Sequence, residues 1–359
     1  MKVLALNSSP RGAGQSKTNL MLTPLVEGMQ DAGAEVEIIE LRHKTIKYCI
    51  GCYTCWTKTP GSCIHKDDMT GELFPKWLAS DMTVYATPLY NYGMNAALKA
   101  FIERTLPSMK PFFEIQNNRM HHPLRFKVPA IALLSVAGMP DEGHFMALSN
   151  QMKYATATPG RQLIAEIYRP AAEMLTSPAV KDQRMEILEA TAQAGRELVR
   201  SQKISPATMA IVTQPLLESQ SFAHLANAFW KTCITEGVTP KEFWKKNLRP
   251  RPDSLPAFML MMPMGFNPDG AKDLRATLQF EFSGEVEGAC HFIIVDDAIS
   301  ARAGRTEKPD LTITSPFEVW MDIMVGKADG AEMLMEGKYT AEGDMDLLLN
   351  MGKMFGKAS

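Results

Sequence analysis

Four of the six cysteines gather in one stretch of sequence, in the pattern Cys49-x2-Cys52-x2-Cys55-x7-Cys63. Three thiols so close together, with a fourth nearby, are typical of a segment that wraps a [4Fe–4S] cluster. Structural zinc sites more often pair two short Cys or His arms that lie about a dozen residues apart. The pattern therefore favours a cluster, and free thiols, a redox-active pair or zinc are the alternatives.

A segment rich in Ser, Pro and Gly, Ser8 to Thr18, lies between a short apolar run and a helical pattern. Small residues let the backbone curl around an anion, and the hydroxyls and free N–H groups at a helix N-terminus bind phosphate. The segment has neither the Walker spacing nor the Gly-x-Gly-x-x-Gly fingerprint of dinucleotide sites. It predicts a phosphate-binding loop of another kind.

A second loop, Thr87 to Met94, directly follows another apolar run. Its Tyr90 and Asn91 can stack on an aromatic ring system and hydrogen-bond to it. The alternative is a surface turn whose tyrosines are partly buried.

The elements that must position these loops alternate between strands and helices. Helices are expected after Ser16, over Ala96–Leu106 and over Phe145–Ala155, and strands over Val3–Asn7, Ala34–Leu41, Met82–Ala86, Val128–Val136 and Leu163–Tyr168. Such alternation predicts an α/β fold with a doubly wound parallel five-stranded sheet. In the strand order 2-1-3-4-5 the ends of strands 1 and 3 meet at the switch point, where ligands bind.

The chain changes character near residue 250. Lys181–Phe243 shows helices over Arg184–Arg200 and His224–Ile234, and the Pro-rich segment Lys245–Pro256 predicts a linker. An α+β unit follows, with strands over Ala276–Phe282, Ala289–Val295, Ala298–Ala303 and Asp310–Thr314, and helical segments over Phe317–Val325 and Tyr339–Met351. We therefore expect two domains, residues 1–245 and 256–359.

The charge distribution supports this boundary. Residues 1–252 hold 29 Lys and Arg against 22 Asp and Glu, whereas residues 253–359 hold 9 against 18. A positive first domain suits anionic ligands such as phosphorylated cofactors, but the excess is too small to indicate nucleic acid. No apolar run approaches the roughly 18 residues that span a bilayer, and the N-terminal apolar run is too short for a signal peptide. These features predict a cytoplasmic protein.

The first domain resembles the NAD(P)H-dependent FMN reductase-like flavoproteins, specifically the branch of the iron–sulfur flavoproteins. The resemblance lies in Ser-Pro-Arg before the Gly-rich loop, Pro-x-Tyr-Asn before the Lys99–Arg104 helix, and the cysteine loop between them. It implies a flavodoxin-like fold with FMN, and a [4Fe–4S] cluster at Cys49, Cys52, Cys55 and Cys63. The implied cofactor residues are Ser9, Arg11, Ser16, Lys17 and Thr18 for the phosphate, Pro88, Leu89, Tyr90, Asn91 and Gly93 beside the flavin, and Ala137 and Gly138 in a third loop.

The second domain resembles a sterol carrier protein type 2 domain. The resemblance lies in motifs spread in order over about 100 residues, among them Phe266-Asn267-Pro268, Pro309-Asp310-Leu311 and Met335-x-Gly337-Lys338. It implies a curved sheet covered by helices around an apolar cavity for a lipid. This part also carries 11 of the 25 methionines, a residue that fills cores and adaptable cavities.

Together these features predict an FMN-dependent, NAD(P)H-linked oxidoreductase that passes electrons to an organic or iron–sulfur acceptor. The fused domain is expected to hold a lipid or quinone, and a homodimer or homotetramer is expected from the resemblance. The alternatives are an electron-transfer iron–sulfur flavoprotein without NAD(P)H activity, and a lipid carrier with a flavodoxin scaffold. No side-chain acid and base pair stands out as catalytic.

Overall fold

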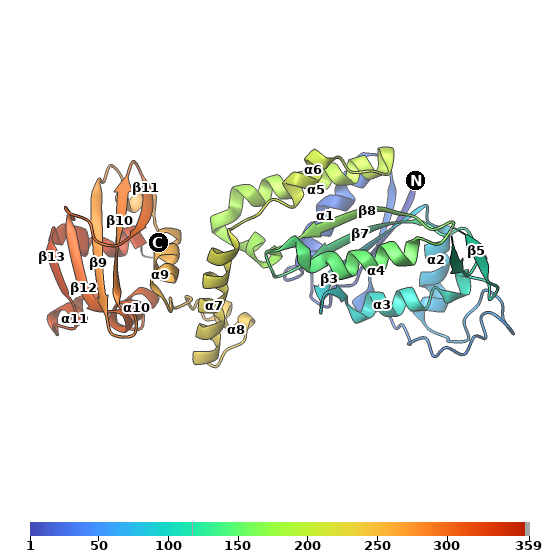
Figure 1. Ribbon diagram of the computed structural model, residues 1–359, viewed down its shortest axis with the longest axis horizontal. Helices are drawn as coiled ribbons and strands as arrows, with labels where there is room; N and C mark the ends of the chain where they lie inside the picture. The colour runs from blue at the N-terminus through green and yellow to red at the C-terminus, as the bar shows by residue number, and fades with distance from the viewer. Residues whose placement is uncertain (117, 356–359) are drawn as a thin grey trace. The chain divides into compact units, whose positions relative to one another are not determined.

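The computed structural model describes residues 1–116 and 118–355. The chain forms two compact units, Met1–Leu216 and Leu217–Ser359, each with its own sheet (Figure 1).

The first unit is built on a parallel sheet of five strands in the order β2-β1-β3-β7-β8. The strands are β1 (Lys2–Asn7), β2 (Glu35–Glu40), β3 (Met82–Tyr90), β7 (Ala130–Val136) and β8 (Leu163–Arg169). Numbered along this sheet, the order is 2-1-3-4-5, the flavodoxin-like order. The fold predicted from the sequence is confirmed.

Helices cover both faces of this sheet (Figure 1). One face carries α1 (Lys17–Asp31), with α5 (Lys181–Ser201) and α6 (Pro206–Val212) on the same side. The other carries α2 (Phe74–Ala79), α3 (Ala96–Glu103) and α4 (Met146–Thr156), whose apolar residues form one core with Leu4, Leu6 and Tyr85 of the strands. Because both faces are covered, β7 is an almost continuous apolar run, interrupted only by Ser135.

Two glycines allow α1 and α5 to pack backbone to backbone. A Cβ at Gly28 would lie 1.8 Å from the Ala192 carbonyl oxygen, and one at Gly195 would lie 2.1 Å from that of Leu25. Side chains larger than hydrogen therefore cannot be placed there without separating the helices.

We predict that Gly28→Ala lowers the free energy of unfolding of the first unit by about 2–3 kcal/mol, since overpacking forces a backbone shift. Urea titration would measure it. Gly71→Ala is the matched control, because its added Cβ would meet nothing within 4 Å. Equal effects of the two substitutions would contradict the packing argument.

Some boundaries differ from those predicted. Strand β3 continues past Ala86 to Tyr90 because the chain turns back there and pairs through β4 (Gly93–Met94). Helix α3 ends at Glu103 rather than Leu106: Arg104 is its C-cap, and a short 3-10 turn over Leu106–Ser108 follows. The short hairpin of β5 (Glu114–Gln116) and β6 (Arg119–His121) was not predicted.

The second unit is a mixed sheet with helices. It begins with α7 (Ser219–Thr235), α8 (Pro240–Lys245) and α9 (Leu255–Met264). Its sheet has the order β11-β10-β9-β12-β13, in which only β9 and β12 pair in parallel. The strands are β9 (Ala276–Ser283), β10 (Gly288–Val295), β11 (Ala298–Ala303), β12 (Leu311–Pro316) and β13 (Thr340–Gly343), and the remaining helices are α10 (Phe317–Val325), α11 (Gly330–Met335), α12 (Met345–Leu349) and α13 (Met351–Phe355).

The expectation of helix over Tyr339–Met351 was partly wrong. Thr340–Gly343 forms the edge strand β13, which pairs with β12 before α12 begins. Four residues on an exposed edge are too few for an alternating pattern to be visible in the sequence.

The segment predicted as a linker, Lys245–Pro256, is held by contacts within the second unit. The Arg251 amide donates to the Thr232 hydroxyl of α7 at 2.8 Å, and the Arg251 guanidinium pairs with Asp322 of α10 at 3.1 Å. Lys231 of α7 pairs with Asp253. Helices α7 and α8 thus group with the second unit, and the division into domains of residues 1–245 and 256–359 stays a prediction.

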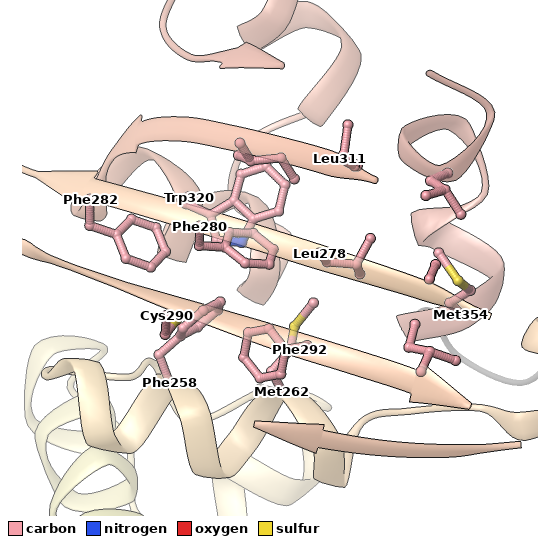
Figure 2. Packing of buried hydrophobic residues seen from close by; sticks show 14 of the residues in the cluster. Phe258, Met262, Leu278, Phe280, Phe282, Cys290, Phe292, Leu311, Trp320 and Met354 are labelled. Atoms are coloured by element: carbon pink, nitrogen blue, oxygen red, sulfur yellow. The ribbon is translucent and has the colours of Figure 1, made fainter. Parts of the chain in front are cut away.

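The core of the second unit is dominated by aromatic rings (Figure 2). Phe258 of α9 contacts Phe280 and Phe292 of the sheet, with ring centroids 5.2 and 5.5 Å apart. Phe280 also contacts Phe282 and Trp320. These rings fill the space between α9 and the sheet, and the lipid-sized cavity implied by the resemblance stays a prediction.

Candidate functional site

The three predicted loops lie at the carboxyl ends of adjacent strands. The first follows β1, the second follows β3 and the third follows β7, and these strands are neighbours in the sheet. Asn7 is in register with Ala86, and Pro88 with Val136. The loops therefore meet at the switch point of the sheet, where doubly wound folds bind their ligands.

The first loop leads into the N-terminus of α1. Ser9, Ser16 and Thr18 are buried, and the Ser16 hydroxyl caps the helix by accepting from the Asn19 amide at 3.0 Å. The Ser9 hydroxyl accepts from the Arg11 amide at 3.3 Å. Ser16 occupies only one of the first-turn N–H groups of α1, and the ends of helices leave several such groups without a partner inside the helix, so this end can receive an anion.

Two cations stand beside this end of α1, and one carboxylate already pairs with both. Glu173 lies 2.6 Å from an Arg11 nitrogen and 3.3 Å from the Lys17 ammonium nitrogen. The Lys17 side chain is mostly buried and that of Arg11 is exposed. Glu173 was not predicted, because it follows β8, far from the loop in sequence.

The second loop is a tight hairpin that is tied to the first loop. Pro88, Leu89 and Gly93 are half-buried, whereas Tyr90 and Asn91 are exposed at its tip. The Asn95 side chain donates to the Ser8 carbonyl and caps α3 by accepting from the Leu98 amide at 3.3 Å. Asn95 was not predicted from the sequence, in which its position before the helix is the only signal.

The third loop begins at Ala137, which is buried, and Gly138, which is exposed. The Ala137 amide donates to the Arg169 carbonyl at 3.0 Å, and the Ala137 carbonyl accepts from the Ala172 amide at 2.8 Å. The structure thus brings all twelve predicted cofactor residues to one edge of the sheet.

The four clustered cysteines line one hollow, together with His65, Arg104 and other residues. Burial raises the pKa of the Cys55 thiol, and the neighbouring Cys63, Cys49 and Cys52 thiols raise it further. The hollow has only about 20 Å³ of free space, and no three His, Cys, Asp or Glu of residues 1–116 and 118–355 are placed to hold a single ion. The cysteines therefore surround a space rather than converge on a point.

A buried ion pair between Arg104 and Asp67 lies where the two ends of the cysteine loop meet. Both nitrogens of the Arg104 fork donate to Asp67, at 2.7 and 3.0 Å, and one also donates to the Lys47 carbonyl at 2.6 Å. Both side chains are almost fully buried. Burial raises the pKa of Asp67, but hydrogen bonds from Arg104 and from the Lys47 and Thr70 amides outweigh it and hold the pKa well below its usual range.

Two buried side-chain nitrogens, Arg104 Nε and His65 Nε2, lie beside the cysteines and have no hydrogen-bond partner among the described residues. Buried polar groups are normally paired, and the sulfurs of a cluster could accept from the Arg104 N–H. The number of thiols matches a [4Fe–4S] cluster, whose four irons each take one thiolate.

Family models match the two parts of the chain separately. Residues 1–164 match the NADPH-dependent FMN reductase family, and residues 267–356 match the SCP-2 sterol transfer family. The chain joins an FMN reductase-family domain to an SCP-2-family domain. Both resemblances expected from the sequence are confirmed.

Relatives of the FMN reductase domain are iron–sulfur flavoproteins. One from Archaeoglobus fulgidus is 37% identical over 107 residues, which are 30% of this chain and 46% of the relative. One from Methanocaldococcus jannaschii is 32% identical over 117 residues, which are 33% of this chain and 58% of the relative. The chain thus spans about half the length of the relatives it matches.

Solved structures resemble the same domain at low identity. An NAD(P)H:quinone oxidoreductase from Methanothermobacter marburgensis is 17% identical with a TM-score of 0.41, and the match covers 55% of this chain and 96% of that one. An azoreductase from Bacillus anthracis is 18% identical with a TM-score of 0.38, covering 55% of this chain and 98% of that one.

In the described parts of the SCP-2 and FMN reductase domains, no helix has the length and apolarity to cross a membrane.

Proposed function

We propose that the FMN reductase domain binds FMN across the three loops and acts as an NAD(P)H-linked oxidoreductase. The observation that carries this proposal is the convergence of the loops after β1, β3 and β7 at the switch point. FMN, when bound, would supply the two-electron chemistry between a reduced nicotinamide and an acceptor.

The residues of the chain would then bind and orient the cofactor. Ser9, Ser16 and Thr18 would donate hydroxyls to the phosphate, and Arg11 and Lys17 would balance its charge. Pro88, Leu89, Tyr90, Asn91 and Gly93 would lie against the ring system, with Ala137 and Gly138 at its other edge. The buried Asn95 would keep the first two loops in a fixed relation to one another.

The first experiment is the absorption spectrum of the full chain purified without oxygen. We expect flavin bands that bleach when NADPH or NADH is added. A colourless chain that does not take up added FMN would overturn the proposal, and bands that bleach with dithionite but not with either nicotinamide would overturn the NAD(P)H link alone.

We predict that Glu173→Gln tightens FMN binding about two- to fivefold, because it frees Arg11 and Lys17 and removes a negative charge beside the phosphate. The dissociation constant would be measured by flavin fluorescence. The gain should shrink in high salt, which screens exposed charges.

The control for this prediction is Asp31→Asn. It makes the same change of charge at the far end of α1, about 20 Å from the loop for a helix of 15 residues. FMN affinity that rises equally in both variants would show a general charge effect and would contradict a role of Glu173 in the site.

We further propose that Cys49, Cys52, Cys55 and Cys63 hold a [4Fe–4S] cluster that exchanges electrons with the flavin. Helix α3 connects the two sites: Asn95 caps its N-terminus beside the first loop, and Arg104 at its C-terminal end lines the cysteine hollow. Eight helical residues rise about 12 Å, so the two sites lie at opposite ends of one short rigid element.

This arrangement also favours the second candidate function, electron transfer without direct NAD(P)H activity. Iron and sulfide analysis of the anaerobic protein tests the cluster that this candidate requires. Four irons per chain support the cluster, whereas iron-free protein supports a redox-active pair or free thiols in its place.

For the SCP-2 domain we propose binding of an apolar molecule such as a lipid or a quinone. The proposal rests on the family match and on the aromatic and methionine-rich interior, since methionine adapts to irregular ligands. Extraction of the purified full chain with organic solvent, followed by mass spectrometry, would identify a retained molecule. A domain that retains none and binds no added fatty acid or quinone would contradict it.

We also propose a cytoplasmic homodimer or homotetramer. None of the six cysteines forms a disulfide, as is usual in a reducing compartment. Light scattering of the purified chain tests the oligomeric state, and fractionation of the source cells tests the compartment.

A further inference from the structure

A hollow of about 480 Å³ lies beside the second loop, lined by residues that the FMN proposal does not use. Tyr92 lines it from the hairpin, and Asp141, Gly143, His144, Met146, Ala147 and Asn150 line it from the segment that runs from the third loop into α4. Tyr92 directly follows Tyr90 and Asn91, which the proposed function places against the flavin ring. The hollow therefore borders the proposed ring site.

Tyr92 has an unusual backbone conformation. Tyr90 pairs with Gly93 across the hairpin, so Asn91 and Tyr92 are the two central residues of the turn, with φ values of 48° and 62°. Turns of this kind favour Asn-Gly, because the second residue must be left-handed. A bulky residue there is strained, and such strain is often kept where a side chain is needed for function.

The Tyr92 ring forms a pair with His144. The two ring planes are 9° from parallel, and their centroids are 5.9 Å apart. The His144 Nδ1 lies 3.1 Å from the Asp141 carbonyl oxygen. The next residue, Phe145, is buried and stacked on Tyr168, which fixes the position of the backbone that carries His144. The Tyr92 side chain is half-exposed.

We propose that this hollow binds the electron-poor planar ring of the redox partner, on the aromatic pair of Tyr92 and His144. Aromatic side chains stack on flat rings in offset arrangements, and Asn150 provides an amide for the carbonyl group that such a ring carries. Nicotinamide and quinone rings share this chemistry. The inference rests on the proposed FMN function and names where its partner binds.

The test is Tyr92→Gly in the full chain loaded with FMN. The substitution removes the ring and relieves the left-handed strain. We expect the KM for NADPH or for menadione to rise about tenfold, while kcat, FMN content and thermal stability do not fall. The substrate whose KM moves identifies the ring that binds. Tyr92→Phe, which keeps the ring, should retain the original KM.

Tyr154→Ala is a matched control. Tyr154 is an exposed tyrosine of the same helix α4 that does not line the hollow. We expect no change in either KM. A rise equal to that of Tyr92→Gly would show nonspecific attraction to surface tyrosines and would overturn the proposal.

A binding measurement separates this inference from the proposed function. The affinities of menadione and of NADP⁺ for the chain can be measured without turnover by saturation-transfer NMR. Binding of either that weakens in Tyr92→Gly upholds the inference, even if the chain proves to have no reductase activity. Unchanged affinities and KM values overturn it, as does loss of FMN from Tyr92→Gly, since Tyr92 would then belong to the cofactor site.

Discussion

Asp67→Ala is expected to lower the free energy of unfolding of the first unit by about 3–5 kcal/mol. The substitution leaves the Arg104 guanidinium buried without its counter-ion, and an unpaired buried charge is the costly outcome of breaking such a pair. The Lys47 and Thr70 amides also lose their acceptor. Urea unfolding followed by circular dichroism would measure the loss.

The double variant Asp67→Leu with Arg104→Met is the control for charge. It removes both ions together, so no buried charge is left, and we expect it to be more stable than Asp67→Ala alone. If the double variant loses as much stability as the two single substitutions lose together, the loss comes from altered packing and not from an unpaired buried charge.

The pH dependence of the Asp67 contribution has a definite sign. The folded chain holds the pKa of Asp67 below its usual range, so the stabilisation is fully present above the ordinary aspartate pKa of about 3.9. It is lost as the pH falls through the lower folded-state value. The stability difference between the native chain and Asp67→Asn should therefore shrink below about pH 4 and stay constant above it.

The same substitution separates the two proposed cofactors. Lys47 and Asp67 flank the cysteine loop, and Arg104 joins them, so Asp67→Asn should lower the iron content. The FMN loops lie at the other end of α3 and should keep their flavin. Loss of both cofactors together would show that the first unit as a whole had unfolded.

The sequence predicted the positions of the three loops because each loop is a local feature of the chain. Each loop follows directly after an apolar strand, and parallel strands bring their carboxyl ends to one edge of the sheet. Ser16 was predicted at a helix start and is the N-cap of α1. The alternation of strands and helices was therefore sufficient to place the loops together.

The partners that complete the sites could not be predicted in the same way. Glu173 reaches Arg11 from the end of β8, and Arg104 reaches Asp67 across 37 residues of sequence. The conformation of Tyr92 depends on the pairing of Tyr90 with Gly93. Such contacts can be predicted only when the strand order and register are known, because no local sequence pattern indicates them.

Phe280→Ala is expected to destabilise the SCP-2 domain by about 3–5 kcal/mol, as truncation of a fully buried aromatic side chain does. The Phe280 ring contacts those of Phe258, Phe282, Phe292 and Trp320 (Figure 2). Calorimetry of the full chain would measure the loss, and Met335→Ala, at a site 82% exposed, should change little.

The size of this loss also bears on the proposed apolar ligand. If the rings fill the interior as packed here, the variant gains a dry cavity, and an apolar ligand that enters it should stabilise the variant more than the native chain. A loss below about 1 kcal/mol would mean that Phe280 is not tightly packed in solution. The interior would then already hold a cavity of the kind that a lipid-binding domain requires, and the ligand should stabilise the native chain as strongly as the variant.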